Sequence, residues 1–164
     1  MRITLDGIAK GRVVDGGVAA LKSMGFTNIL VEAGGDLLAY GAHPDGSYWK
    51  IGVVNPRPSA GHPWLTTISV EDRAVATSGD YQQTFTSDYH LNHIIDPRSG
   101  VSPAELSSAT VIASSVTEAD ALATTLMVLG VADGLALVER LPGVEALVAT
   151  KDLNIFKSAG FPAA

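Results

Sequence analysis

An apolar segment with two carboxylates near its start, Glu118 and Asp120, constrains the fold of this 164-residue chain more than any other feature. Residues 117–130 are mostly Ala, Leu and Val, and Leu122, Leu126 and Leu129 follow one another at spacings of four and three. This spacing predicts a helix with one buried apolar stripe, and Gly130 is suited to end it in a left-handed conformation. The rest of the chain must therefore supply a core for this helix.

The polar residues at the start of this helix have two interpretations. Asp120 and Thr124 are four residues apart, so a helix projects both from neighbouring turns of one face. A carboxylate and a hydroxyl placed in this way can share a hard cation such as Mg²⁺. The alternative is a capping box, because Thr117 and Asp120 have the Thr-x-x-acid pattern that satisfies free N–H groups at a helix start. Spacing alone favours the capping box.

Composition excludes several classes of function. Lys and Arg total 11 against 17 for Asp and Glu, and there is no dense basic run, so neither nucleic acid nor an anionic membrane surface is an expected partner. The absence of cysteine excludes disulfides, thiolate metal sites and a Cys nucleophile. We expect one domain over residues 1–164, because a chain of this length can bury its own core. No apolar run approaches the roughly 18 residues of a membrane span, and the start of the chain does not resemble a signal peptide.

Apolar patterns and turn residues predict the other elements. A short strand should close near Leu5, and a glycine-rich approach at residues 6–11 should lead into a helix that stops at Gly25. A further helix is expected at 132–141 and a surface loop at 56–63. The predicted strands cover residues 28–33, 37–40, 49–54, 65–70, 74–77, 108–113 and 144–149.

The order of these elements predicts an α+β fold, with a mainly antiparallel sheet packed by helices. Gly34-Gly35-Asp36 should form a hairpin turn, in which the glycines either take positive φ or let the backbone approach a ligand closely. Segments 17–36 and 134–152 both run helix, glycine, strand and polar turn, which suggests an internal duplication.

Five stretches, taken in order, resemble the ApbE family of flavin transferases, also described as FAD:protein FMN transferases. Each stretch is common alone, whereas the ordered set is specific, and it covers nearly all of this chain but only the C-terminal part of the family's usual chain. The resemblance implies an ApbE-like, T-fold-like structure without the family's N-terminal segment. The stretches are Gly-Ile-Ala-Lys-Gly (7–11) with Val14-Asp15, Ala-Gly-Gly-Asp (33–36), Ala-Thr-Ser-Gly-Asp-Tyr (76–81), His-Ile-Ile-Asp-Pro-Arg-Ser-Gly (93–100) and Ala-Asp-Ala-Leu-Ala-Thr (119–124).

The resemblance also implies roles for particular residues. Asp120, Thr124 and the Gly7 carbonyl would bind Mg²⁺, which raises the metal interpretation above the capping box. His93 would act as the catalytic base, in preference to forming a transition-metal site with His90, for which no third nitrogen or sulfur ligand is in view. The residues that would contact FAD are Lys10, Ile94, Gly34, Gly35, Ser78 and Gly79.

The implied reaction is Mg²⁺-dependent transfer of FMN from FAD to a Thr hydroxyl of an acceptor protein, with release of AMP. The alternative is a non-catalytic FAD-binding or structural module derived from the family. Without the N-terminal segment, we expect apolar surface that favours self-association or a partner chain. Family members commonly act in the periplasm or cell envelope, and the chain itself leaves the compartment and the acceptor open.

Overall fold

The computed structural model describes residues 5–58 and 62–162. Residues 1–4 of the expected first strand and 59–61 of the predicted surface loop lie outside the described residues. The helices are α1 (Asp6–Ser23) and α2 (Val116–Val138). The strands are β1 (Ile29–Ala33), β2 (Asp36–Tyr40), β3 (Trp49–Val54), β4 (Trp64–Val70), β5 (Arg73–Gly79), β6 (Leu106–Ala113), β7 (Glu145–Thr150) and β8 (Ile155–Lys157).

Six of the strands form one antiparallel sheet, in the order β1-β2-β5-β6-β7-β8. The other two, β3 and β4, pair only with each other as an antiparallel ribbon within the described part of the chain. The predicted α+β fold with an antiparallel sheet is confirmed. The suggested duplication does not give equivalent positions in the sheet, because β1 after α1 is an edge strand whereas β7 after α2 is an inner strand.

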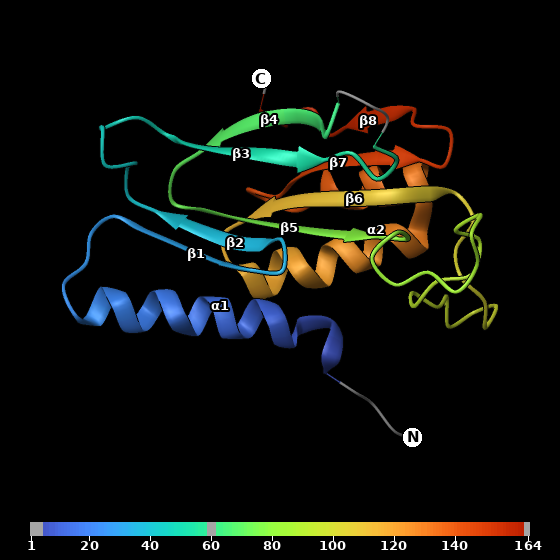
Figure 1. The fold of residues 1–164 in the computed structure, drawn as a ribbon, viewed down its shortest axis with the longest axis horizontal. Coiled ribbons are helices and arrows are strands. Elements are labelled where there is room, and N and C mark those ends of the chain that lie inside the picture. Colours follow the sequence, from blue (N-terminus) through green and yellow to red (C-terminus); the bar gives the residue numbers. More distant parts are fainter. Residues whose placement is uncertain (1–4, 59–61, 163–164) are drawn as a thin grey trace.

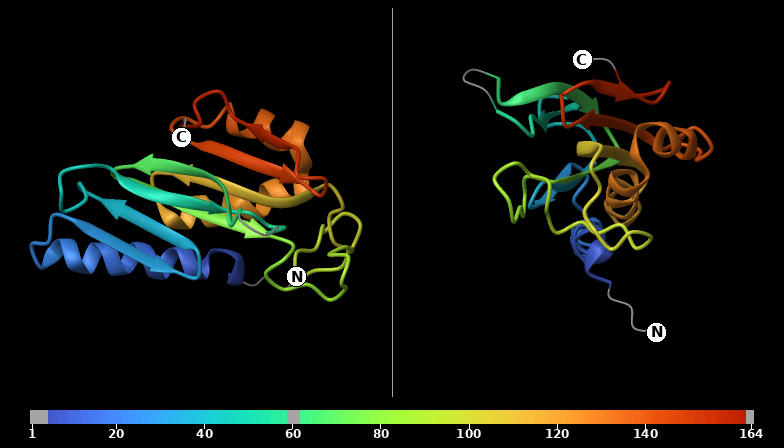
Figure 2. Two further views of the ribbon diagram at one scale, coloured as in Figure 1. Left: turned by 45° about the horizontal axis from the view of Figure 1, so that its top comes forward. Right: turned by 90° about the vertical axis from the view of Figure 1, so that its right-hand side faces the viewer.

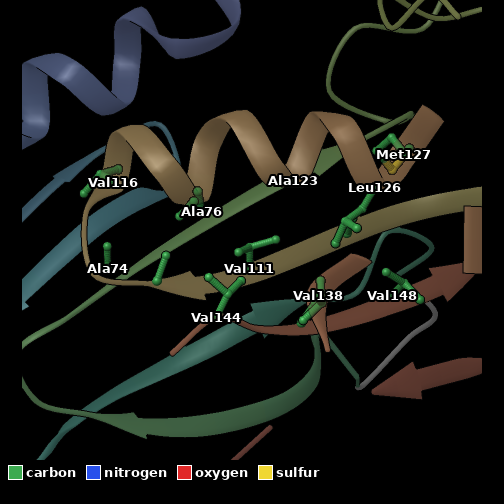
Figure 3. Packing of buried hydrophobic residues seen from close by; sticks show 14 of the residues in the cluster. Ala74, Ala76, Val111, Val116, Ala123, Leu126, Met127, Val138, Val144 and Val148 are labelled. Atoms are coloured by element: carbon green, nitrogen blue, oxygen red, sulfur yellow. The ribbon is translucent and has the colours of Figure 1, made fainter. Parts of the chain in front are cut away.

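The molecule has three layers, with both helices on one face of the six-stranded sheet and the β3–β4 ribbon on the other (Figures 1 and 2). Successive residues of β5 alternate between these layers, as a pleated strand requires. Ala74 and Ala76 pack toward the helices, where α2 contributes Leu126 and Met127 (Figure 3). Val75 packs instead with Ile68 of the ribbon. The sheet therefore has a buried core on each face.

Helix α1 includes the glycine-rich segment that was expected to precede it. The helix begins at Asp6, so residues 7–11 form its first turns, and the predicted approach loop is wrong. The predicted stop is confirmed, because Met24 caps the helix and Gly25 has a φ of 90°. The glycines permit close packing at Gly11, where an added Cβ would lie 2.5 Å from the Val116 carbonyl oxygen.

Helix α2 leaves the helical conformation at Gly130, where the chain was expected to break. The conformation there is not left-handed helical, since φ is 80° and ψ is −171°, and a second helical segment follows directly to Val138. By length and composition α2 could cross a membrane. A core helix has the same apolar composition, and α2 packs against β5, β6 and β7 in the core of the folded domain.

The charged connection at residues 71–73 links two different layers. β4 pairs with β3 in the ribbon, whereas β5 pairs with β2 and β6 in the sheet. Asp72 has a φ of 51°, and its carboxylate accepts a hydrogen bond from the Gly41 N–H at 2.9 Å. The turn therefore carries the chain from the ribbon into the sheet.

Candidate functional site

The Asp120 carboxylate faces α1 and takes no part in capping its own helix. Its Oδ2 accepts a hydrogen bond from the backbone N–H of Gly11 at 3.0 Å, and the side chain is buried. This contact is possible because the start of α2 approaches α1 closely at Gly11, which has no side chain. In a regular helix the Gly11 N–H donates to the Gly7 carbonyl. Its hydrogen bond to Asp120 therefore competes with the bond to Gly7, whose carbonyl is the predicted metal ligand.

The predicted capping box is wrong, because other side chains cap α2. Ser115 is the N-cap residue, and its hydroxyl accepts from the Glu118 N–H at 3.2 Å. Asp15 of α1 accepts from the N–H groups of Val116 and Thr117 at 2.8 and 3.0 Å, and from the Thr117 hydroxyl at 2.5 Å. A carboxylate from one helix thus satisfies the free donors at the start of the other.

Thr124 lies one turn after Asp120 and contacts β5. Its hydroxyl is 2.9 Å from the hydroxyl of Ser78, one of the residues predicted to contact the cofactor. Thr124 and Gly7 line one hollow of about 240 Å³ between the two helices, together with Leu5, Ile8 and Ala121. Two of the residues predicted to bind the metal therefore line the same space.

Lys10 links α1 to the β1–β2 turn. Its ammonium nitrogen donates to the Gly34 carbonyl at 3.2 Å and lies 3.1 Å from Asp36 Oδ2. Gly34 and Gly35 have φ values of 60° and 93°, which confirms the predicted tight turn. The structure thus brings together two of the predicted FAD-contacting regions, the start of α1 and the Gly-Gly turn.

Asp36 is a buried carboxylate to which the sequence assigned no role beyond its place in a turn and in one of the family motifs. Its Oδ1 accepts from the Thr77 N–H at 3.3 Å, and among the described residues its Oδ2 has only the Lys10 ammonium as a partner. Burial raises the pKa of Asp36 from 3.8 to about 6, against the opposing effect of Lys10, and the charge of Asp120 adds to the rise. The charge of Asp120 therefore acts on Asp36 across the site.

A second hollow, of about 420 Å³, lies between the Gly34-Gly35 turn and the β3–β4 ribbon. Its wall is largely apolar and includes Trp64 and Tyr81. The predicted contact residue Gly79 stands just outside this hollow, where an added Cβ would lie 2.3 Å from the Tyr81 ring. Glycine at this position therefore lets the Tyr81 ring fold back against β5.

His93 and Ile94 lie on the long segment between β5 and β6. The His93 side chain is exposed, and its backbone N–H donates to the Gln83 carbonyl at 3.0 Å. Ile94 is buried and belongs to the core between helices and sheet, so its contact with a flavin stays a prediction. This segment lies at the same end of the molecule as the start of α1 (Figures 1 and 2), although the described contacts do not join His93 to Asp120 or Thr124.

The predicted metal ligands have the chemistry that Mg²⁺ requires. Asp120, Thr124 and the Gly7 carbonyl offer only oxygen atoms, and Mg²⁺ is commonly held by one or two carboxylates with the other positions taken by water and substrate phosphates. In the described part of the chain, no three His, Cys, Asp or Glu side chains are grouped to hold a metal ion. A metal site here would therefore need oxygen atoms from the backbone, from hydroxyl groups and from the ligand. The buried Oδ2 of Asp36 accepts no hydrogen bond from the described residues, which is compatible with a cation nearby.

Sequence reasoning missed three polar groups, which centre on Asp15, Asp36 and Asp80. Asp15 and Asp36 lie within family motifs, but no local pattern connects them with partners far along the chain. The third group centres on Asp80, which is fully buried and pairs with Arg57 and Lys151. These two cations follow β3 and β7, in connections that carry no recognisable motif.

Comparison with known proteins agrees with the motif pattern. The model of the ApbE family matches residues 1–148. A FAD:protein FMN transferase from Treponema pallidum is 37% identical over 98% of this chain and 47% of its own length. One from Vibrio cholerae is 39% identical over 84% of this chain and 41% of its own length.

Solved structures give the same result. The ApbE protein of Thermotoga maritima has a TM-score of 0.87 and 34% identity, and the match covers 99% of this chain and 54% of that one. The flavinyl transferase ApbE of Pseudomonas stutzeri has a TM-score of 0.81 and 36% identity, over 96% of this chain and 50% of that one. The chain thus spans about half the length of the relatives that it matches.

Proposed function

Because the chain belongs to the ApbE family, we propose that it takes part in the transfer of FMN from FAD to an acceptor protein. The observation that carries this proposal is the orientation of Asp120, which faces Gly11 of α1 and leaves the capping of α2 to Asp15 and Ser115. Because other residues cap α2, the Asp120 carboxylate is available for a ligand at the helix crossing.

In the proposed site, Asp120, Thr124 and the Gly7 carbonyl hold Mg²⁺ at the hollow between α1 and α2. When bound, the ion would neutralise negative charge on the pyrophosphate of FAD. Lys10 stands beside the same helix crossing with an ammonium group that is about one-third exposed, so it can contribute positive charge toward the phosphates.

The Gly-Gly turn and Ser78 belong to the proposed FAD-contacting region, and Ile94, which is buried beside it in the core, stays a predicted contact. Gly34 and Gly35 leave the tip of the β1–β2 hairpin free of side chains, so the backbone there is accessible to a ligand. Ser78 is held by Thr124, which couples this region to the proposed metal ligands.

His93 is the proposed general base, because its side chain is exposed at the same end of the molecule. It would take the proton of an acceptor Thr hydroxyl. The Thr oxygen then bonds to the phosphorus of the FMN moiety, the bond from that phosphorus to AMP breaks, and AMP leaves. His93 thus needs access to solvent and to the acceptor, which its exposure provides.

The direct test incubates this chain with FAD, Mg²⁺ and an acceptor protein that contains a candidate Thr. Mass spectrometry should show addition of FMN to the acceptor, and chromatography should show an equal amount of AMP. FAD binding without either product would instead support a non-catalytic FAD-binding module. Neither binding nor turnover would contradict both functions.

A further inference from the structure

The segment that carries His93 contains no helix or strand between β5 and β6, so its order depends on individual contacts, of which the backbone bond from His93 to Gln83 is one. An exposed general base has to be held in one place, because small displacements from a productive geometry cost much of the rate. The first residue of this segment, directly after β5, is Asp80.

Asp80 is buried completely and holds two cations from separate connections. Arg57 donates two hydrogen bonds to its carboxylate, at 2.8 and 2.7 Å, and Lys151 donates a third at 2.5 Å. A buried carboxylate is stable only with such partners. Asp80 therefore fixes the positions of both cations.

Both cations also contact Tyr89 in the segment itself. The Lys151 ammonium donates to the Tyr89 carbonyl at 2.7 Å, and the Arg57 guanidinium lies 3.8 Å from the centre of the Tyr89 ring. Tyr89 has a φ of 62°, which a bulky side chain adopts only where its surroundings impose it. The two cations supply those surroundings.

The same Tyr89 carbonyl accepts from the side-chain amide of Asn92 at 3.4 Å. Asn92 is buried, and its side-chain oxygen accepts from the Ile94 N–H at 3.0 Å. The backbone of Asn92 exchanges two hydrogen bonds with the Ser102 hydroxyl, at 2.9 and 2.8 Å. The contacts thus run from Asp80 to the residues on both sides of His93.

We propose that Asp80 is a positioning residue for His93, acting through Arg57 and Lys151 on the backbone of Tyr89. The consequence for FMN transfer rests on the proposed function, whereas the order of the segment does not. An alternative is that the three charged groups only stabilise the fold, in which case their loss would weaken β5 and β6 as much as the segment.

The first test measures amide hydrogen exchange by NMR in the full chain. Lys151→Met removes the link to Tyr89 and leaves Asp80 paired with Arg57, so the variant should fold. We expect exchange at the N–H groups of His93 and Ile94 to rise about tenfold or more, while exchange at Val111 in β6 stays unchanged. Lys157→Met, which removes a cation on the neighbouring strand β8, is the matched control and should change neither.

Asp80→Asn should act in the same direction and more strongly. If that variant does not fold, Lys151→Met still decides the outcome. Unchanged exchange at His93 and Ile94 in Lys151→Met, or an equal rise throughout β5 and β6, would overturn the positioning role. This measurement needs neither FAD nor acceptor, so it stands even if the chain transfers no FMN.

The second test applies once transfer has been measured for the parent chain. Lys151→Met should lower kcat about tenfold with little change in KM for FAD, and Lys151→Arg, which keeps a cation, should restore most of it. A change confined to KM would place these residues in FAD binding and would contradict positioning.

Discussion

At the scale of single residues, two buried carboxylates of the site differ in what holds them. Asp120 accepts a hydrogen bond from the Gly11 backbone N–H, whereas Asp36 accepts one from the Thr77 backbone N–H on β5 and also pairs with the Lys10 ammonium. The first arrangement suits a group that binds a cation, and the second suits a group that orients Lys10. The two residues should therefore respond differently when the carboxylate is replaced by an amide.

We expect Asp120→Asn to weaken Mg²⁺ binding in the presence of FAD by about 10- to 100-fold, because the amide cannot supply a charged ligand. The amide oxygen can still accept from Gly11, so stability should change by less than about 1 kcal/mol. Titration calorimetry and urea unfolding measure the two effects. Glu118→Gln, on the same helix but outside the site, is the control, and equal Mg²⁺ affinity in both variants would leave Asp120 without a metal role.

Asp36 should make stability depend on pH. Its pKa in the folded protein, about 6, is above the ordinary 3.8, so the native state binds the proton more tightly than the unfolded chain. The stabilisation from this group is complete below about pH 4 and is lost as the pH rises through 6. A shift of roughly two units corresponds to at most about 3 kcal/mol.

Asp36→Asn removes this dependence. In metal-free buffer, the unfolding free energy of the variant relative to the parent should therefore increase by up to about 3 kcal/mol between about pH 4 and pH 7.5. Urea unfolding at the two pH values measures it. A difference that stays constant across this range would show that the pKa of Asp36 is not raised in the folded protein.

At the scale of elements, the site depends on the close crossing of α1 and α2. Gly11 allows the approach, Asp15 caps α2, and Asp120 returns a contact to α1. These three contacts are reciprocal, so each helix supplies part of the other's hydrogen bonding. A change in the spacing of the helices should disturb both stability and the proposed ligands.

Gly11→Ala and Gly16→Ala form a matched pair in α1. An added Cβ at Gly11 meets the Val116 backbone at 2.5 Å, so we expect a loss of about 1–3 kcal/mol in stability. At Gly16 nothing lies within 4 Å of an added Cβ, and Ala should instead stabilise the helix by about 0.5–1 kcal/mol. Thermal and urea unfolding compare the two, and a stable Gly11→Ala variant would show that the helices can separate without cost.

At the scale of the whole molecule, one margin of the sheet is not covered. β1 is an edge strand in the described part of the chain, and Leu30 points to the ribbon side where β3 and β4 do not extend over it. Phe26, just before this strand, is also exposed. Exposed apolar side chains beside an unpaired strand edge favour association with another chain.

We therefore expect the isolated chain to self-associate through this edge. Leu30→Lys should shift the population toward monomer in sedimentation velocity, because a charge at an edge strand opposes pairing. Val101→Lys, at an exposed apolar residue of the long segment at the other end of the molecule, should leave the distribution unchanged. A monomeric parent, or equal effects of both substitutions, would exclude association through β1.

The sequence by itself determined most of the elements and their breaks. The strand at 108–113, the hairpin at Gly34-Gly35 and the interruption at Gly130 each follow from patterns a few residues long, which depend on the backbone's own periodicity. The ordered motifs likewise pointed to the family, and they include Gly7 and Thr124, which line the hollow at the helix crossing.

Only the tertiary structure decided which side chain serves which partner. Asp120 could cap its own helix or face another, and the choice depends on Gly11, 109 residues earlier, bringing α1 close enough to accept the contact. Asp80 carries no local mark of its two cations, because they reach it from connections on other strands. Burial makes these pairings obligatory, and burial is a property of packed layers that no short stretch of sequence contains.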